Sequence, residues 1–289
     1  MLNQLRLTNK LLIILSVMTI TLSSGCSDKK TIYELSSYQN YFDSLKIDLV
    51  HSIPSAANYY LKNIKSLSVE KRDSAFFIFT HYYYKVKFKL NDSLMYDLDL
   101  LNKLENKAFN KDSVVTGFKK IVSESGFKLN QSEGYYYVEE SPNYLYSKFG
   151  KYVSPAISEY LSIRKKELNE GFAQDAALMI SFKSITQRIL TWQDYLIKFP
   201  DSYYSSQVNS YTNMYINALL GGLDNSPIFD ENRLLLPEVK KAYDYFIQKS
   251  DSTENFLLIN DLYKKLEKNS FKVNDEILDL INSRHESNE

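Results

Sequence analysis

The scarcity of glycine limits the folds that this chain can adopt. Its 289 residues include 8 glycines and 6 prolines, and no glycine occurs between Gly25 and Gly117. A glycine in a helix interior costs about 1 kcal/mol relative to alanine, so long stretches with few glycines and prolines suit helices. The composition therefore predicts a mainly α-helical protein.

Apolar side chains recur at the spacing of amphipathic helices, three, four or seven residues apart on one face. Residues 38–125 contain four such stripes: Ala56, Tyr59, Tyr60, Ile64 and Leu67; Phe76, Phe79, Tyr83, Val86 and Leu90; Leu94, Leu98, Leu101 and Ala108; and Val115, Phe118 and Val122. We expect each stripe to mark one helix that packs against a common core.

Proline, glycine and capping residues mark the helix boundaries of the second half. Ser154 and Pro155 have the pattern of a cap followed by a first-turn proline, and Gly171 is placed to end that helix. Further boundaries are expected at Pro200, at a cap formed by Asp201 and Ser202, at Gly221 and Gly222, at Pro237, and at a capping box of Asp251 and Glu254.

Residues 126–138 interrupt the helical pattern. Phe127 and Leu129 alternate with polar residues, a polar turn that contains glycine follows, and Tyr135 to Val138 form a second short run. Two such runs around a turn predict a β-hairpin, which needs helices to pack on because an isolated hairpin is only marginally stable. The expected fold is stacked helical hairpins, tetratricopeptide-like or an irregular α-bundle, with one small β-hairpin.

The expected organisation has five segments. They are a cleaved signal peptide, a lipidated leader, an N-terminal helical part, a hairpin with a C-terminal helical part, and a polar tail, at residues 1–25, 26–36, 37–125, 126–271 and 272–289. An offset of fifty residues relates Asp194 and its neighbours to Asp244 and its neighbours, which suggests stacked helical repeats.

Two resemblances concern the helical body. The string YLIKFPDS resembles the helix–turn junction of tetratricopeptide-like repeats, although it lacks the Trp-Leu-Gly positions of that motif. The pieces GYYYVEE, SKFGKYVSPAISEYL, WQDYLIKFPDS and LLGGLDNSPIFD, within about residues 134–271, resemble an uncharacterised bacterial envelope helical domain. That resemblance implies no activity and no catalytic residue.

The N-terminus has the parts of a secretory signal. Arg6 and Lys10 precede an uncharged apolar run over residues 11–22, and small residues lead to Cys26. The run is too short to cross a bilayer, which takes about 20 apolar residues. Cys26 is the single cysteine, so it cannot form an internal disulfide and is free, paired with another chain or modified.

This arrangement resembles the type II signal peptide of Bacteroidetes-type bacterial lipoproteins, in which the cysteine is lipidated. The position three before the cysteine is Ser23 where such signals usually have leucine, and an ordinary cleaved signal is the alternative interpretation. The resemblance implies a diacylglycerol and an amide-linked acyl chain on Cys26. It also implies an envelope location, expected at the outer membrane. Asp28, Lys29 and Lys30 leave the periplasmic and surface faces open.

Charge and motifs exclude several functions. The chain has 35 basic and 35 acidic residues, which gives no electrostatic case for nucleic acid. The catalytic motifs HExxH, GxSxG and CxxC are absent, as are the nucleotide-binding P-loop and GxGxxG. The three histidines are far apart in sequence, so we assign no metal, no cofactor and no catalytic residue.

Two places are candidate ligand sites. Asp224, Asn225 and Asp230 lie in a loop whose oxygens suit a hard cation or a polar ligand, although such residues also form ordinary turns. Tyr136 belongs to three consecutive strand tyrosines, of which at least one faces away from the core, as suits a sugar or protein contact. Glu139 and Glu140 are expected at a solvated strand end on opposite faces.

Three functions follow from these observations. The first is a non-enzymatic binding or scaffold module that holds an envelope protein partner in a groove between helices. The second is a surface glycan-binding lipoprotein that uses tyrosines, and the third is a hydrolase that uses scattered carboxylates. Helical-repeat character, near-neutral charge and missing catalytic motifs favour the first, and the glycan-binding lipoprotein is the alternative.

Overall fold

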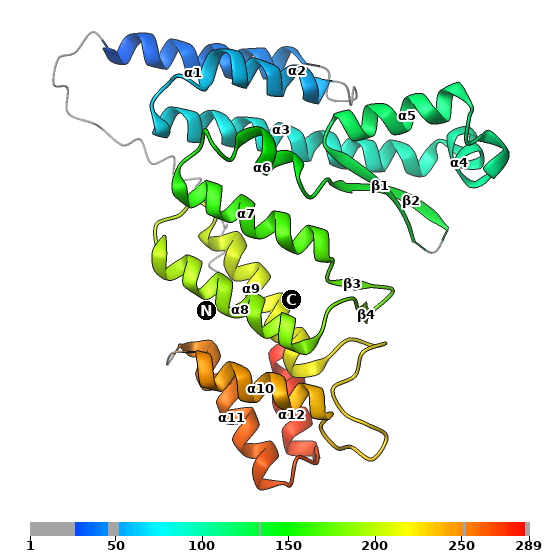
Figure 1. Ribbon diagram of the computed structural model, residues 1–289, viewed down its shortest axis with the longest axis vertical. Coiled ribbons are helices and arrows are strands. Elements are labelled where there is room, and N and C mark those ends of the chain that lie inside the picture. Colours follow the sequence, from blue (N-terminus) through cyan, green and yellow to red (C-terminus); the bar gives the residue numbers. More distant parts are fainter. Residues whose placement is uncertain (1–26, 46–51, 133, 251–252, 287–289) are drawn as a thin grey trace, which may run out of the picture.

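The computed structural model describes residues 27–45, 52–132, 134–250 and 253–286 (Figure 1). This part of the chain confirms the mainly helical fold with its β-hairpin and contains twelve α-helices. They are α1 (Ser27–Ser44), α2 (Ser52–Tyr59), α3 (Val69–Tyr96), α4 (Leu98–Glu105), α5 (Ser113–Glu124), α6 (Tyr144–Phe149), α7 (Pro155–Glu170), α8 (Phe182–Lys198), α9 (Ser205–Gly221), α10 (Pro237–Lys249), α11 (Glu254–Lys268) and α12 (Asp275–Glu286).

The helices form three tiers (Figure 1). Helices α1, α2, α3 and α6 make the first tier, which α4, α5 and the hairpin extend at one end. Helices α7, α8 and α9 make the second tier, and α10, α11 and α12 make the third. Helix α8 packs on both α9 and α10, and Asp194 and Asp244, related by the fifty-residue offset, lie on α8 and α10.

One hydrophobic core runs through all three tiers. Phe149 of α6 lies with its ring centroid 5.0 Å from Tyr60 and 4.6 Å from Phe79. Helix α6, which follows the expected boundary at residue 125, thus contributes to the core of the first tier. Burying such aromatic side chains supplies a large share of core stability.

Strand β1 (Phe127–Ser132) pairs antiparallel with β2 (Tyr135–Glu140), and Leu129 lies opposite Val138. Val138 is buried on the side of the hairpin that faces the helices. A side chain of α3 binds the outer edge of β2. The Asn91 amide nitrogen donates to the Val138 carbonyl at 3.1 Å, and its amide oxygen accepts from the Val138 N–H at 2.7 Å. This side chain satisfies backbone groups of an edge strand that would otherwise lack partners.

The expected helix through Leu94 and Leu98 is instead two helices. Helix α3 continues to Tyr96, and Asp97 begins α4 because its side chain accepts a hydrogen bond from the Leu100 N–H at 3.0 Å. Leu98 is consequently 70% exposed. A capping aspartate placed within an apolar stripe thus ends one helix and starts the next.

The expected leader and tail are also helical. Residues 27–36 belong to α1, and α12 lies within residues 272–289. Val273, Ile277 and Ile281 recur every four residues and are buried, so this segment closes the third tier. Among the described residues, no helix is long and apolar enough to cross a membrane.

Local capping differs from expectation at two helices. Thr253 caps α11 by accepting from the Phe256 N–H, whereas the expected Asp251 lies outside the described residues. Helix α9 begins at Ser205, beyond the Asp201–Ser202 pair. The boundaries at Ser154, Pro155, Gly171, Gly222 and Pro237 are confirmed.

A second, two-residue hairpin was not expected. Strands β3 (Ala173–Gln174) and β4 (Ala177–Leu178) pair directly after Gly171. Asp175 and Ala176 at its turn have φ values of 49° and 55°, a region that residues other than glycine rarely adopt. Asn225 holds this turn through hydrogen bonds to the carbonyls of Asp175 and Ala176.

Candidate functional site

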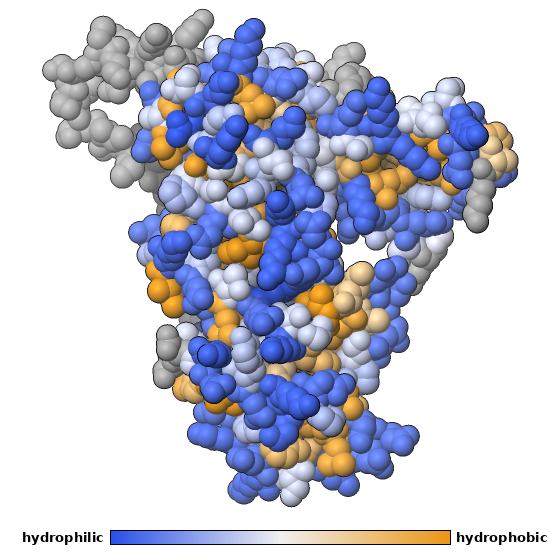
Figure 2. Space-filling model, in the orientation of Figure 1, coloured by the Kyte–Doolittle hydropathy of each residue, from blue (hydrophilic) through white to orange (hydrophobic). Residues whose placement is uncertain are grey.

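A polar cleft lies between the β1–β2 hairpin and the second tier. Its outer compartment has a volume of about 720 Å³ and is lined by the hairpin, the end of α7, the β3–β4 hairpin, and parts of α8 and α9. Figure 2 shows open space between the hairpin and the body below it. The fold thus brings together segments that are far apart in sequence.

A smaller compartment of about 390 Å³ adjoins it, between α3, β2, α7 and α9. The two compartments share the lining residues Glu139, Arg164, Leu168 and Tyr211. Tyr84, Tyr160 and Tyr204 add phenol groups to the smaller one. Arg164 therefore lies where the two parts of the cleft meet.

Arg164 is held by its neighbours in a fixed position. Its Nη1 donates to Oε2 of Glu167 at 2.8 Å, and its guanidinium carbon lies 4.1 Å from the centroid of the Tyr211 ring. The side chain is 16% exposed. An ion pair and a stacked ring both restrict the motion of a guanidinium. A ligand that binds the remaining N–H donors would therefore cost little further side-chain conformational entropy.

Glu167 is the buried carboxylate that orients Arg164. Its side chain is 3% exposed, and Oε1 accepts a hydrogen bond from the indole Nε1 of Trp192 at 2.7 Å. A buried charge is tolerated when it is paired and hydrogen-bonded, and both conditions are met here. Glu167 thereby ties α7 to α8 directly beneath the cleft.

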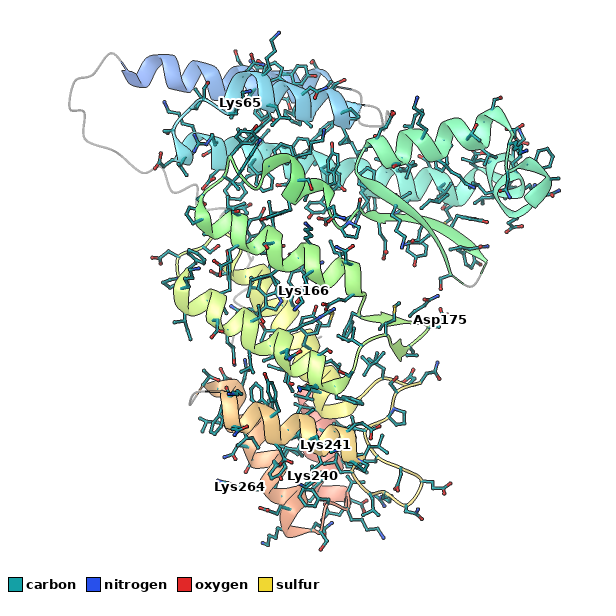
Figure 3. All side chains as sticks on the ribbon, viewed as in Figure 1. Lys65, Lys166, Asp175, Lys240, Lys241 and Lys264 are labelled. Atoms are coloured by element: carbon teal, nitrogen blue, oxygen red, sulfur yellow. The ribbon has the colours of Figure 1, made fainter. Side chains whose placement is uncertain are left out.

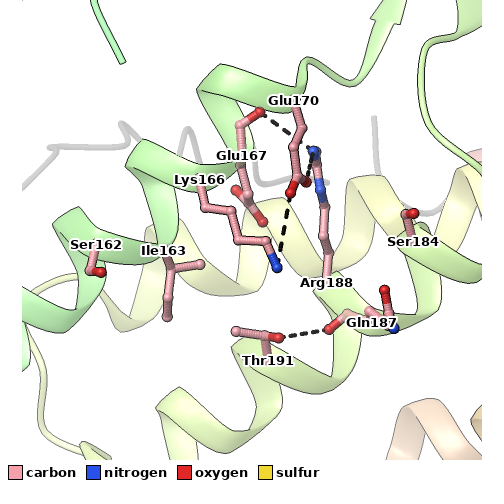
Figure 4. A pocket seen from close by; sticks show the side chains of 9 residues that line it. All are labelled: Ser162, Ile163, Lys166, Glu167, Glu170, Ser184, Gln187, Arg188 and Thr191. Carbon is pink, nitrogen blue, oxygen red and sulfur yellow. Dashed lines mark hydrogen bonds and ion pairs between the residues drawn. The ribbon is translucent and has the colours of Figure 1, made fainter. Parts of the chain in front are cut away.

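Arg188 of α8 fixes the end of α7. Its Nη2 donates to the Gly171 carbonyl at 2.6 Å and to Oε2 of Glu170 at 3.1 Å, and Nη1 donates to the Tyr215 hydroxyl at 3.1 Å. A cation that binds the last carbonyls of a helix stabilises its end. Figure 4 shows Arg188 and Lys166 converging on Glu170 beside a cavity of about 230 Å³ between α7 and α8.

Glu140 is a cleft residue that sequence reasoning placed at a solvated strand end. Its Oε2 accepts from the Tyr84 hydroxyl at 3.1 Å. Burial raises the pKa of this carboxyl, while Arg164, the Tyr84 hydrogen bond and Lys87 act in the opposite direction. Glu140 is half-buried beside α3 and α7, and these long-range neighbours could not be inferred from a strand-end pattern.

The two faces of β2 divide its tyrosines. Tyr137 lines the outer compartment, whereas Tyr136 packs beside Leu94, Leu100, Leu104 and Val115 and donates its hydroxyl to the Leu104 carbonyl at 3.1 Å. Tyr136 shares a face with Val138, because alternate strand residues point the same way. The sequence contained a signal for this division. An apolar residue at Val138 predicts that Tyr136 faces the core and that Tyr137 faces the opposite side.

The predicted loop residues have structural partners. The Asn225 side chain donates to the Asp175 carbonyl at 2.6 Å, and Oδ1 of Asp230 accepts from the backbone N–H groups of Asn232 and Leu234. Asp224 is exposed in the same loop. Within the described residues, no group of three or more histidine, cysteine or acidic side chains is placed to hold a metal ion.

Asn225 thereby braces a contact that bounds the cleft. Its backbone N–H also donates to the Ala176 carbonyl at 2.9 Å, which holds the β3–β4 turn. From that turn, labelled at Asp175 in Figure 3, the Asp175 carboxylate accepts a hydrogen bond from the Ser132 hydroxyl at 2.8 Å. This contact joins the tip of the long hairpin to the second tier.

Comparisons with protein-family models, with curated proteins and with solved structures found no match to the chain. Cys26, the predicted lipidation site, lies outside the described residues. The role of the cleft is therefore inferred from its own residues.

Proposed function

We propose that this chain is a lipid-anchored binding module of the bacterial cell envelope, and that its ligand occupies the cleft around Arg164. The carrying observation is the immobilised Arg164 at the meeting point of two compartments, fixed by the buried Glu167 and stacked on Tyr211. The anchor is an acylated Cys26, expected at the outer membrane on either its periplasmic or its surface face.

A glycan is the occupant that the lining of this cleft favours. Tyr137 provides an aromatic side chain, and Asn130, Gln131 and Gln174 provide amide donors and acceptors. Aromatic faces stack on the apolar faces of sugars, while amides and charged groups bind hydroxyls. Glu139 and Glu140 both line the smaller compartment, where Glu139 accepts a hydrogen bond from Asn130 and Glu140 accepts one from Tyr84.

An envelope protein partner is the second candidate, and a different surface supports it. Met95, Tyr96 and Leu98 are 59%, 74% and 70% exposed at the junction of α3 and α4. Figure 2 shows apolar atoms at that end of the first tier. Exposed apolar patches of this kind often mark protein contacts.

The anchor is tested by replacing Cys26 with alanine. The variant should lose fatty-acid labelling and leave the membrane fraction, because stable attachment needs acyl chains and the described helices supply no membrane span. Cell fractionation with a labelled fatty acid measures both effects. A variant that still partitions with membrane lipid would show that Cys26 is not the anchor.

The cleft is tested on a glycan array with the intact lipoprotein in detergent. Tyr137→Ala should weaken binding by about two- to tenfold, since an aromatic contact contributes about 0.5–1.5 kcal/mol. Tyr135→Ala is the matched control, because Tyr135 is 71% exposed on the same strand and does not line the cleft. Equal binding by the two variants, or no glycan binding by the unaltered protein, contradicts this role.

The protein-partner candidate is tested by co-purification of the intact lipoprotein. Leu98→Asp should lower recovery of a specific envelope protein by about fivefold or more, as loss of a central contact of more than 1 kcal/mol implies. Ile197→Asp on α8, where Ile197 is 68% exposed, is the control. A preparation without any specific partner would exclude this candidate.

A further inference from the structure

The guanidinium of Arg164 has donors that the protein does not use. Nη1 is paired with Glu167, and Tyr211 covers one face of the group. Among the described residues, no hydrogen bond joins Nη2 or Nε of Arg164 to any acceptor. Both cleft compartments include Arg164 in their lining, so these donors are available to a ligand.

The charged groups around Arg164 are of both signs. In the smaller compartment, the cations Lys87 and Arg164 line the same space as the carboxyls Glu139 and Glu140. The Glu139 carboxylate accepts a hydrogen bond from Asn130, and that of Glu140 accepts from Tyr84. Those hydrogen bonds come from neutral groups and leave both carboxylates charged, so binding of a ligand carboxylate rests on the directed free donors of Arg164 and not on a net positive charge.

We propose that the ligand of this cleft is an acidic oligosaccharide built of uronic acids, and that Arg164 binds its carboxylate through Nη2 and Nε. A guanidinium fits a carboxylate with two parallel hydrogen bonds, which gives both strength and orientation. This inference rests on the proposed glycan-binding function, since it names the ligand class of the same cleft.

An acidic peptide would offer the same carboxylate, but the cleft suits it less well. An extended peptide commonly binds by adding a strand to a free sheet edge. The edge of β2 is occupied at Val138 by the Asn91 amide, which pairs with both backbone groups of that residue. The amide and phenol groups of the lining match sugar hydroxyls instead.

The decisive experiment is calorimetric titration of the intact lipoprotein in detergent with an oligogalacturonate and with its methyl ester. The ester replaces each carboxylate by an uncharged methyl ester and leaves the sugar hydroxyls unchanged, so the unaltered protein should bind the ester at least tenfold more weakly. A charged hydrogen bond contributes about 1.5–3 kcal/mol, which corresponds to a factor of ten or more. An oligoglutamate peptide of similar length is the third ligand.

Variants then assign the carboxylate to Arg164. Arg164→Gln should weaken oligogalacturonate binding at least tenfold, and Arg164→Lys should weaken it less while keeping the Glu167 ion pair. Arg233→Gln is the control, since Arg233 is exposed and pairs with Asp275 outside the cleft. The ester comparison needs no variant, so it stays informative even if Arg164→Gln unfolds the protein.

Each contrary result has a distinct meaning. Equal binding of acid and ester, with binding still sensitive to Tyr137→Ala, overturns the carboxylate inference and leaves the glycan-binding cleft in place. Tighter Arg164-dependent binding of the oligoglutamate overturns the assignment to a sugar. Failure of the unaltered protein to bind any of these sugars or the glycans of an array overturns the glycan-binding function as well.

Discussion

The cleft depends on one buried charge, the carboxylate of Glu167. It accepts from Trp192 on α8 and pairs with Arg164 on its own helix, so it fixes a helix contact and a binding group together. Removing one partner of a buried pair costs about 3–5 kcal/mol, because the other charge is left uncompensated. An exposed pair such as Lys120 with Glu124 contributes about 0–1 kcal/mol. Glu167 therefore determines the position of Arg164 far more strongly than surface charges could.

The other segments that line the cleft are far apart in sequence, and hydrogen bonds from side chains to backbone groups hold them together. Asn91 attaches the long hairpin to α3, Arg188 holds the end of α7, and Asn225 braces the turn whose Asp175 contacts Ser132. These bonds satisfy backbone groups at strand edges, helix ends and turns, where regular secondary structure leaves them free. The cleft is consequently built where elements end, on a rigid helical scaffold.

Local sequence signals predicted much of this fold, but they did not predict the residues of the candidate site. Spacing of apolar residues and the signals at Pro155, Gly171 and Pro237 placed the helices of the second half, and alternation placed the β1–β2 hairpin. The apolar spacing did not reveal the helix break at Asp97, because the apolar stripe continues across this single capping residue. Arg164 and Glu140 gave no sequence signal, since their roles arise from neighbours on other elements. Cys26 remains a prediction from the N-terminal pattern.

Hydrogen–deuterium exchange of the full-length protein, with and without oligogalacturonate, tests most directly whether the cleft around Arg164 holds the ligand. The account predicts slower exchange in β1–β2, the end of α7 and the first turns of α9, with α10 to α12 unchanged. Those segments contribute most of the lining, so a ligand there would shield their backbone from solvent. Protection confined to α10–α12, or none under saturating ligand, would contradict the assignment.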